Sequence, residues 1–312
     1  MKPNVIGIAA DGAQFPPAAF LAQKLAAMNP RDDTDVLLVS DSARDLGVAN
    51  AWGGLGCKLA LINSGIRFTG DGRVSGAAFY RLALPRLSGA RRLLYLDTDT
   101  FPDSAALFDL FDLDMRGHAI AAVRDVEVTC LDTPIKRAEL NLAGRAHDRR
   151  YFNSGVLLVD TDCFEQQTVE NRCLREVAAN DLHDQAALNK VMNGQWLELS
   201  PAFNMTPIAY LAGLHRAIRP VITHFMGRAK PWHGALFYLD HPARREIEAF
   251  IPRSPWPTFL AGNPTSEMVK IEPWTPPAAF IASLADYLRE TGFAGADFSL
   301  GGATAVPAAK QF

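Results

Sequence analysis

Six short apolar segments alternate with longer stretches of helical periodicity along this chain, and this alternation constrains the fold more than any other feature. The segments are residues 5–10, 36–40, 93–96, 119–123, 155–159 and 221–225. Their length and apolar content are typical of buried strands. Because strands that alternate with helices usually form parallel sheets, the sequence predicts an α/β fold with a largely parallel sheet.

Size and charge exclude several classes of protein. The chain has 312 residues and a formal net charge of −3. Acidic and basic residues are interleaved, so we expect no nucleic-acid partner, which would require a strongly basic surface. The four cysteines lack metal-binding spacing and are expected to be reduced core thiols. The N-terminal apolar run is too short for a secretory signal or a transmembrane segment, which predicts a cytoplasmic protein.

A change in composition near residue 250 predicts two parts, a domain at 1–250 and a C-terminal extension at 251–312. Residues 251–277 are rich in proline and predict an extended linker without helix or strand, packed by its tryptophans. Residues 277–292 predict an amphipathic helix. The extension carries few cations, so strong membrane docking is not expected. The helix would pack on its own domain or on a second subunit, which leaves a homo-oligomer open.

The string LLYLDTDTF at residues 93–101 places two carboxylates, Asp97 and Asp99, directly after a strand. In open α/β sheets ligands bind beyond the carboxyl ends of the strands. Two carboxylates there could ligate a divalent cation that also binds phosphate oxygens. The alternative is a strand end with two solvated aspartates.

The same string also fits the D-x-D-x-T pattern of haloacid-dehalogenase-like phosphatases, in which Asp97 would be the nucleophile. That fold has its motif near the start of the domain and requires a later acidic pair. Here 96 residues precede Asp97, and the sequence has no later paired-aspartate motif. The phosphatase is therefore kept only as an alternative.

Three further strings follow in order: YFNSGVLLVD at 151–160, HDQAALN at 183–189 and HFMGRAKPWH at 224–233. Together with LYLDTDT they resemble glycosyltransferase family 8, the family of glycogenin and of bacterial lipopolysaccharide galactosyl- and glucosyltransferases. The resemblance covers roughly residues 1–235. It implies a GT-A-type fold, with one Rossmann-like nucleotide-binding domain and a mixed, mostly parallel sheet.

The resemblance also implies the reaction and its cofactor. The enzyme would be a retaining hexosyltransferase that moves galactose or glucose from a UDP-sugar to a hydroxyl of a saccharide or glycoconjugate, in lipopolysaccharide or polysaccharide synthesis. Manganese would be the cofactor, with magnesium as the other choice. By resemblance, Asp99 and His224 would bind the metal, and Asp97 would contact the metal or the donor ribose as well. A lone histidine after a strand is, however, more often a core residue.

The diphosphate and the nucleoside would contact residues in two segments. Lys230 and the backbone of Gly227 fall where the family holds the diphosphate, and a lysine there would stabilise the charge of the leaving group. Thr98 would offer backbone contacts. Ala9 and Asp11 would hold the uracil edge and Phe15 would stack on it, unless Phe15 is a core residue. Gly12, Ala13 and Gln14 depart from the family pattern, which leaves open a catalytically weak nucleotide-sugar-binding protein.

The donor sugar and the chemical step fall on the remaining strings. Arg81, Asn153 and Ser154 would contact the sugar, together with Asp184 and Gln185, which are the catalytic candidates. Gln185 is a weak nucleophile, and the family lacks an obvious carboxylate for attack from the opposite face. We therefore expect the acceptor hydroxyl to attack on the same face as the leaving phosphate, with Asp184 stabilising the cationic sugar.

Overall fold

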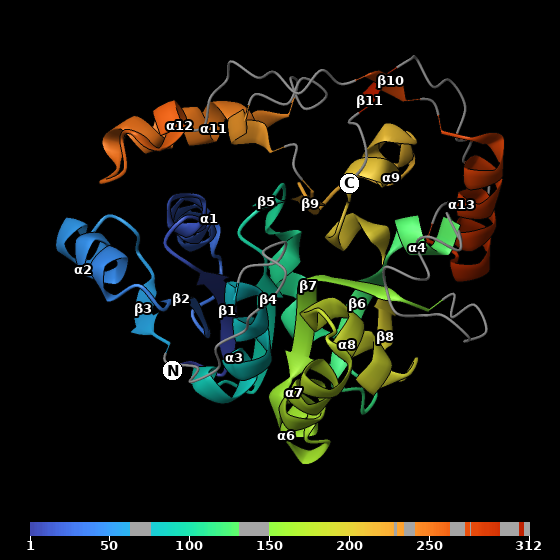
Figure 1. Cartoon of the computed structure of the whole chain (residues 1–312), viewed down its shortest axis with the longest axis horizontal. Coiled ribbons are helices and arrows are strands. Elements are labelled where there is room, and N and C mark those ends of the chain that lie inside the picture. Colours follow the sequence, from blue (N-terminus) through green and yellow to red (C-terminus); the bar gives the residue numbers. More distant parts are fainter. Residues whose placement is uncertain are drawn as a thin grey trace.

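A seven-stranded sheet forms the centre of the computed structural model, with strand order β3-β2-β1-β4-β7-β6-β8. The structure describes residues 1–62, 76–130, 150–227, 230–233, 241–262, 272–274, 276–293 and 306–308. The strands of the sheet are β1 (Asn4–Ala10), β2 (Thr34–Ser40), β3 (Lys58–Leu61), β4 (Arg92–Leu96), β6 (Ile120–Arg124), β7 (Phe152–Asp160) and β8 (Leu197–Leu199). Within this sheet β7 alone runs antiparallel to its neighbours. The predicted mixed, mostly parallel sheet is confirmed (Figure 1).

Helices cover both faces of the sheet. Side chains alternate along each strand, so a strand such as β1 presents apolar residues to both faces. On β1, Ile6 and Ile8 face α1 (Phe15–Met28), while Val5 and Ala9 face α3 (Tyr80–Ser88). The α1 face also carries α2 (Ala43–Trp52), η2 (Ala105–Asp112) and α11 (Pro242–Phe250). The α3 face also carries α6 (Thr161–Gln166), α7 (Val169–Asn180) and α8 (Asp184–Met192).

A second, two-stranded sheet joins β5 (Thr100–Pro102) to β9 (Ile222–His224) in antiparallel pairing. The segment 221–225 is a strand as predicted, but it lies outside the central sheet. Thr100 is paired with His224. This small sheet therefore brings a histidine from late in the chain next to the turn that follows β4.

The predicted C-terminal helix is α13 (Ala278–Thr291), and it packs on the rest of the same chain. Its buried residues Phe280, Leu284, Tyr287 and Leu288 form one apolar cluster with α4 (Val126–Cys130) and α9 (Pro207–Leu211). Of the two alternatives for this helix, packing on its own domain is therefore observed (Figure 1). No helix in the described ranges is long and apolar enough to cross a bilayer.

Parts of the proline-rich stretch after residue 250 form regular structure, contrary to the prediction from the sequence. It contains η6 (Ile251–Arg253), α12 (Phe259–Gly262) and β10 (Glu272–Trp274). Packing by a tryptophan is confirmed, because the Trp256 ring lies 5.3 Å from that of Phe15. The prediction of a linker without helix or strand is wrong, and for η6 the reason is a proline in its first turn, which favours a helix start. The remaining elements are η1 (Gly76–Phe79), η3 (Pro201–Phe203), α10 (Leu214–Ala217), η4 (Pro231–His233) and β11 (Val306–Ala308).

Candidate functional site

An aspartate follows each of four parallel strands, at the same edge of the sheet. Asp11, Asp41, Asp97 and Asp125 come directly after β1, β2, β4 and β6. The amino end of the antiparallel strand β7 lies at this edge as well. The edge therefore gathers carboxylates that are far apart in the sequence.

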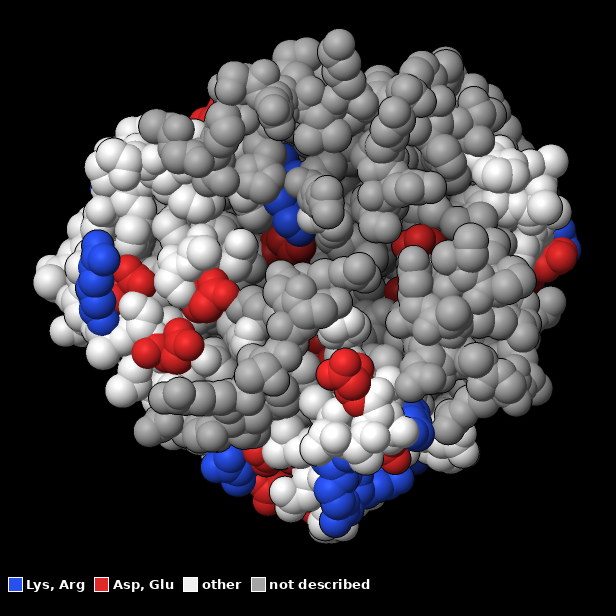
Figure 2. All heavy atoms as spheres, viewed as in Figure 1, with Lys and Arg blue, Asp and Glu red and all other residues white. Residues whose placement is uncertain are grey.

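A cavity of about 550 Å³ opens at this edge. Nine of the predicted site residues line it, namely Arg81, Asp97, Asp99, Asn153, Ser154, Asp184, Gln185, His224 and Gly227. Figure 2 shows acidic and basic atoms next to each other in a hollow near the middle of the face in view. The cavity is within the usual size range of small-molecule sites.

Two carboxylates and an imidazole converge in this cavity. Asp97 and Asp99 flank a tight turn, in which the Thr100 N–H donates to the Asp97 carbonyl oxygen at 3.1 Å. His224 reaches the turn because β9 pairs with β5. Its Nε2 lies 3.2 Å from Asp99 Oδ1 and 3.8 Å from Asp97 Oδ2. One potential ligand atom from each residue lies within 4.8 Å of the others, which is compatible with a divalent cation.

The two oxygens of Asp97 have different surroundings. Oδ1 accepts hydrogen bonds from Arg81 Nη2 at 2.8 Å and from the Tyr95 hydroxyl at 2.6 Å. Burial raises the pKa of Tyr95 well above its usual value, so the phenol stays protonated and donates. The two donors hold the carboxylate so that Oδ2 faces His224. Asp97 is therefore oriented with one oxygen on the protein and the other toward the cluster.

Gly155 leaves the space that this cluster occupies. A Cβ atom at this position would lie 2.2 Å from His224 Cε1 and 2.8 Å from Asp97 Oδ2. Such contacts are impossible, so only glycine fits here. The glycine of the YFNSG string thus has a structural reason that the sequence did not reveal.

A lysine ammonium lies against the second carboxylate of the cluster. Lys230 Nζ contacts Asp99 Oδ2 and donates to the Phe225 carbonyl oxygen at 2.7 Å. Burial by itself raises the pKa of the Asp99 carboxyl, but Lys230 and His224 together lower it well below its ordinary value. Gly227 nearby has a φ of 83°, a conformation that favours glycine. The Asp99 carboxylate is thus held ionised.

Arg81 joins the metal-binding candidates to the catalytic candidates. Its Nη2 bonds Asp97, and its Nε lies 3.1 Å from Asp184 Oδ2. Nη1 donates to the Ser154 carbonyl oxygen at 2.7 Å. Burial lowers the pKa of the guanidinium, but the two carboxylates raise it above its ordinary value, so the cation persists. The structure therefore places Arg81 between two carboxylates, where most of its donors bond protein atoms.

Asp184 and Gln185 begin α8 at the floor of the cavity. Burial raises the pKa of the Asp184 carboxyl, while Arg81 opposes the rise. Gln185 Oε1 accepts from the Ser154 N–H at 3.0 Å, and its Nε2 donates to Asp125 Oδ2 at 3.3 Å. Both ends of the Gln185 amide are thereby positioned.

The N-terminal candidates are only partly brought to the site. Ala9 is buried near the end of β1, and the Asp11 carboxylate accepts the Gln14 N–H at 3.0 Å. Phe15 has 0% exposed surface and packs against Trp256. A ring with no exposed face cannot stack on a base, so Phe15 is a core residue, which is the alternative that the sequence left open. Thr98 lies half-buried in the turn between the two aspartates.

Two polar contacts of this site were missed from the sequence. Tyr95 reads as an apolar strand residue, although its hydroxyl bonds Asp97. Asn204 Oδ1 accepts a hydrogen bond from His224 Nδ1 at 3.0 Å. No motif surrounds Asn204, so only the fold could reveal it.

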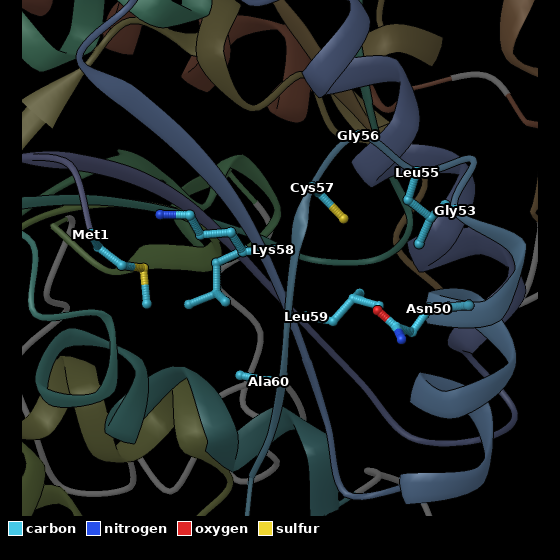
Figure 3. A pocket seen from close by; sticks show the side chains of 11 residues that line it. Met1, Asn50, Gly53, Leu55, Gly56, Cys57, Lys58, Leu59 and Ala60 are labelled. Atoms are coloured by element: carbon cyan, nitrogen blue, oxygen red, sulfur yellow. The ribbon is translucent and has the colours of Figure 1, made fainter.

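A second cavity of about 450 Å³ lies between α2 and β3. Figure 3 shows Cys57 and Leu59 on the α2 side of the strand, with Lys58 and Met1 on the other side. No carboxylate or histidine belongs to its described lining. Burial raises the pKa of the Cys57 thiol to about 12, so this cysteine is a poor nucleophile. Within the described lining, this second cavity therefore offers no group comparable to the carboxylates and histidine of the first.

Comparisons with known proteins show which family this chain resembles. The family model described as Glycosyl transferase family 8 matches residues 68–235, just over half of the chain. General stress protein A of Bacillus subtilis (strain 168) is 28% identical over 212 residues, which cover 61% of this chain and 69% of that protein. Glycosyltransferase GlyF of Streptococcus pneumoniae serotype 4 (strain ATCC BAA-334 / TIGR4) is 26% identical over 260 residues, covering 75% of this chain and 58% of that protein.

The solved structures show the same fold. The galactosyltransferase LgtC, crystallised with donor and acceptor sugar analogs, superposes with a TM-score of 0.62 at 22% sequence identity. The match covers 90% of this chain and 99% of LgtC. At this level of identity the comparison shows the fold alone.

The fold and the site define a glycosyltransferase of the GT-A type, an enzyme that takes a nucleotide-sugar donor and an acceptor. The chain belongs to glycosyltransferase family 8, and its enzyme class is that of the hexosyltransferases. The phosphatase alternative for Asp97 is therefore wrong. Both predictions that rested on the order of the four strings, the family and the fold, are confirmed.

Proposed function

We propose that this protein is a manganese-dependent retaining glycosyltransferase, which moves galactose or glucose from a UDP-sugar to a hydroxyl of a saccharide or glycoconjugate. One observation carries the proposal: the cluster of Asp97, Asp99 and His224 lies in the same cavity as the pair of Arg81 and Asp184. A metal site beside an ion-paired carboxylate suits a reaction that separates a diphosphate from a sugar.

The charges of the cavity support a metal-bound diphosphate. Three carboxylates, Asp97, Asp99 and Asp184, face two basic side chains, Arg81 and Lys230. A divalent cation and the two negative charges of a nucleoside diphosphate sugar would cancel, so their binding would leave the net charge of the cavity almost unchanged. Carboxylate and imidazole ligands together are compatible with manganese, and magnesium is the other choice. When bound, the metal would neutralise charge on the diphosphate and act as a Lewis acid toward the leaving phosphate.

The residues of the chain would have separate tasks in this reaction. Asp97 Oδ2, Asp99 Oδ1 and His224 Nε2 would hold the metal. Lys230 would leave Asp99 and bind the diphosphate instead. This exchange is favourable because the metal ion then neutralises the Asp99 carboxylate in place of the lysine. The open backbone at Gly227 would approach the phosphates.

Transfer would proceed on one face of the sugar. The bond between the anomeric carbon and the phosphate oxygen breaks while the acceptor oxygen bonds to that carbon. The acceptor proton passes to the leaving phosphate oxygen, and UDP is released. Asp184, which lies against Arg81, would stabilise the positive charge on the sugar. Gln185, positioned by Ser154 and Asp125, would contact the sugar.

Release of UDP without an acceptor tests the proposal. The purified protein is incubated with manganese chloride and a panel of UDP-sugars, and slow UDP release is followed with UDP binding measured in parallel. We expect release from one donor, its loss with a chelator, and at least a 100-fold reduction in the Asp99→Asn variant. The matched control is Asp109→Asn, which changes an exposed aspartate on η2.

Three other results of this experiment would each contradict part of the proposal. UDP binding without release from any donor would favour the catalytically weak binding protein. Release that persists in the chelator would show that the metal is not required. A protein that neither binds UDP nor releases it would overturn the proposal.

A further inference from the structure

We propose that Asn204 is a positioning residue, which keeps the proton of the His224 ring on Nδ1 and so leaves Nε2 for the metal. This inference rests on the proposed metal site and assigns a role to a residue outside all four sequence strings. Asn204 follows η3 and is 2% exposed. It lies on the protein side of the histidine, away from the two carboxylates.

The backbone fixes Asn204 beside the histidine. The Met205 N–H donates to the Ile222 carbonyl oxygen at 2.9 Å, and the His224 N–H donates to the Met205 carbonyl oxygen at 3.0 Å. Residue 205 thus extends the small sheet along β9. Asn204, its neighbour in the chain, cannot move away from His224 without breaking this pairing.

The direction of the hydrogen bonds follows from one group that can only donate. The Gly155 N–H donates to Asn153 Oδ1 at 3.0 Å, so this atom of Asn153 is the carbonyl oxygen. The same oxygen lies 2.9 Å from Asn204 Nδ2, which must therefore be the amide nitrogen. The other end of the Asn204 amide is then its carbonyl oxygen.

The oxygen of Asn204 faces His224 Nδ1 at 3.0 Å. An oxygen cannot donate, so the bond requires a proton on Nδ1. Nε2 on the far side of the ring points toward the carboxylates, at 3.2 Å from Asp99 Oδ1. A histidine that binds a metal through one nitrogen usually donates from the other, and this partner orients the ring and raises its basicity as a ligand.

Manganese affinity tests the role of Asn204 without any turnover. Manganese chloride is titrated into the protein, and the free ion is measured by electron paramagnetic resonance. We expect Asn204→Leu, which has a similar volume and no acceptor, to bind about 10- to 100-fold more weakly than the wild type. Asn204→Asp keeps an acceptor for the Nδ1 proton and is expected to recover most of the lost affinity.

A spectroscopic measurement separates this role from packing. In the cobalt-loaded protein, the Nδ1 proton of a metal-bound histidine gives a strongly shifted NMR line that disappears when it exchanges rapidly with water. We expect the line in the wild type and in Asn204→Asp, and its broadening or loss in Asn204→Leu. The control is Asn4→Leu, which removes a similarly buried amide and its bond to Asp33 at the opposite end of β1.

The outcomes distinguish this inference from the proposed function. A wild type that takes up neither manganese nor cobalt would overturn both the metal part of the proposed function and the role of Asn204. A wild type that binds manganese, with Asn204→Leu unchanged in affinity and in the NMR line, would overturn the role of Asn204 alone. An equal loss in Asn4→Leu would assign the effect to general destabilisation and also overturn it.

Discussion

Gly155 is the residue at which one added methyl group tests the geometry of the candidate metal site. The backbone of this residue lies directly beneath His224 and Asp97. The atoms that an added Cβ would meet belong to His224 and Asp97, and a strand itself accepts alanine. Its replacement should therefore affect the site more than the sheet.

The Gly155→Ala variant is expected to lose at least 100-fold in UDP release and to bind manganese more weakly, because the new Cβ pushes the imidazole away from the carboxylates. Donor hydrolysis and manganese titration check this. The control is Gly47→Ala in α2, where an added Cβ meets no atom within 4 Å. This control should be stabilised by roughly 0.5–1 kcal/mol, because alanine favours helix. Full manganese affinity in Gly155→Ala would mean that the ligand geometry is wrong.

At the residue scale the sequence grouped the three metal-binding candidates correctly in space but could not place the apolar candidate. Asp97, Asp99 and His224 were grouped through the four strings, and the structure brings them within 4.8 Å. Phe15 could not be assigned, because an aromatic residue at a helix start looks the same whether it faces a ligand or the core. Asn204 could not be found, because its partners lie 20 and 51 residues away in the chain.

At the element scale, the C-terminal helix α13 links the extension to the edge of the sheet that carries the candidate site. Its apolar face packs on α4, which begins one residue after Asp125. Asp125 in turn accepts the hydrogen bond from Gln185. The guanidinium of Arg124 also lies 4.6 Å from the Tyr287 ring. The domain at 1–250 and the helix should therefore unfold together, although the composition of the sequence divides them into a domain and an extension.

The Leu284→Ala variant is expected to lower the free energy of unfolding by about 2–5 kcal/mol, because Leu284 is fully buried in α13. Urea unfolding, followed by circular dichroism, should show one transition in both proteins. The control is Leu87→Ala, the same change at a side chain that is 41% exposed, which should cost under about 0.5 kcal/mol. A separate early transition in the wild type would instead indicate that the extension is an independent unit.

Elements were predictable to different degrees for a physical reason. The six apolar segments are long enough for their periodicity to show, and all six are strands. Strands β3, β5, β8, β10 and β11 were missed, since β3 is partly exposed and the other four have three residues each without a longer apolar segment such as the one at 221–225 around β9. Their pairing depends on distant partners, as the β5 and β9 pair does, and no local pattern encodes it.

At the scale of the whole molecule, the site is made by topology. Parallel strands deliver their following residues to one edge, and the single antiparallel strand β7 delivers its first residues to the same edge. The sequence could predict the parallel sheet, and with it the place of the site. It could not predict the charge balance of the cavity, because that balance depends on the ion pairs of Arg81 and Lys230.

Metal binding should stabilise the whole molecule, because ligands from β9 and from the turn after β4 meet only in the folded chain. At free manganese of about 100 times its dissociation constant, binding adds about 2.7 kcal/mol to the free energy of unfolding. For 312 residues with an unfolding entropy of ~2 cal/mol/K each, the melting midpoint should rise by about 4 °C.

Thermal unfolding with and without manganese measures this rise, and the comparison between variants shows where it comes from. In Asp99→Asn the rise should vanish, whatever the midpoint of the metal-free variant, because one ligand of the cluster has lost its charge. In Asp109→Asn, which changes an exposed carboxylate away from the cavity, the rise should be that of the wild type. An equal rise in all three proteins would place the stabilising ion elsewhere on the molecule, because binding at another site would not depend on Asp99.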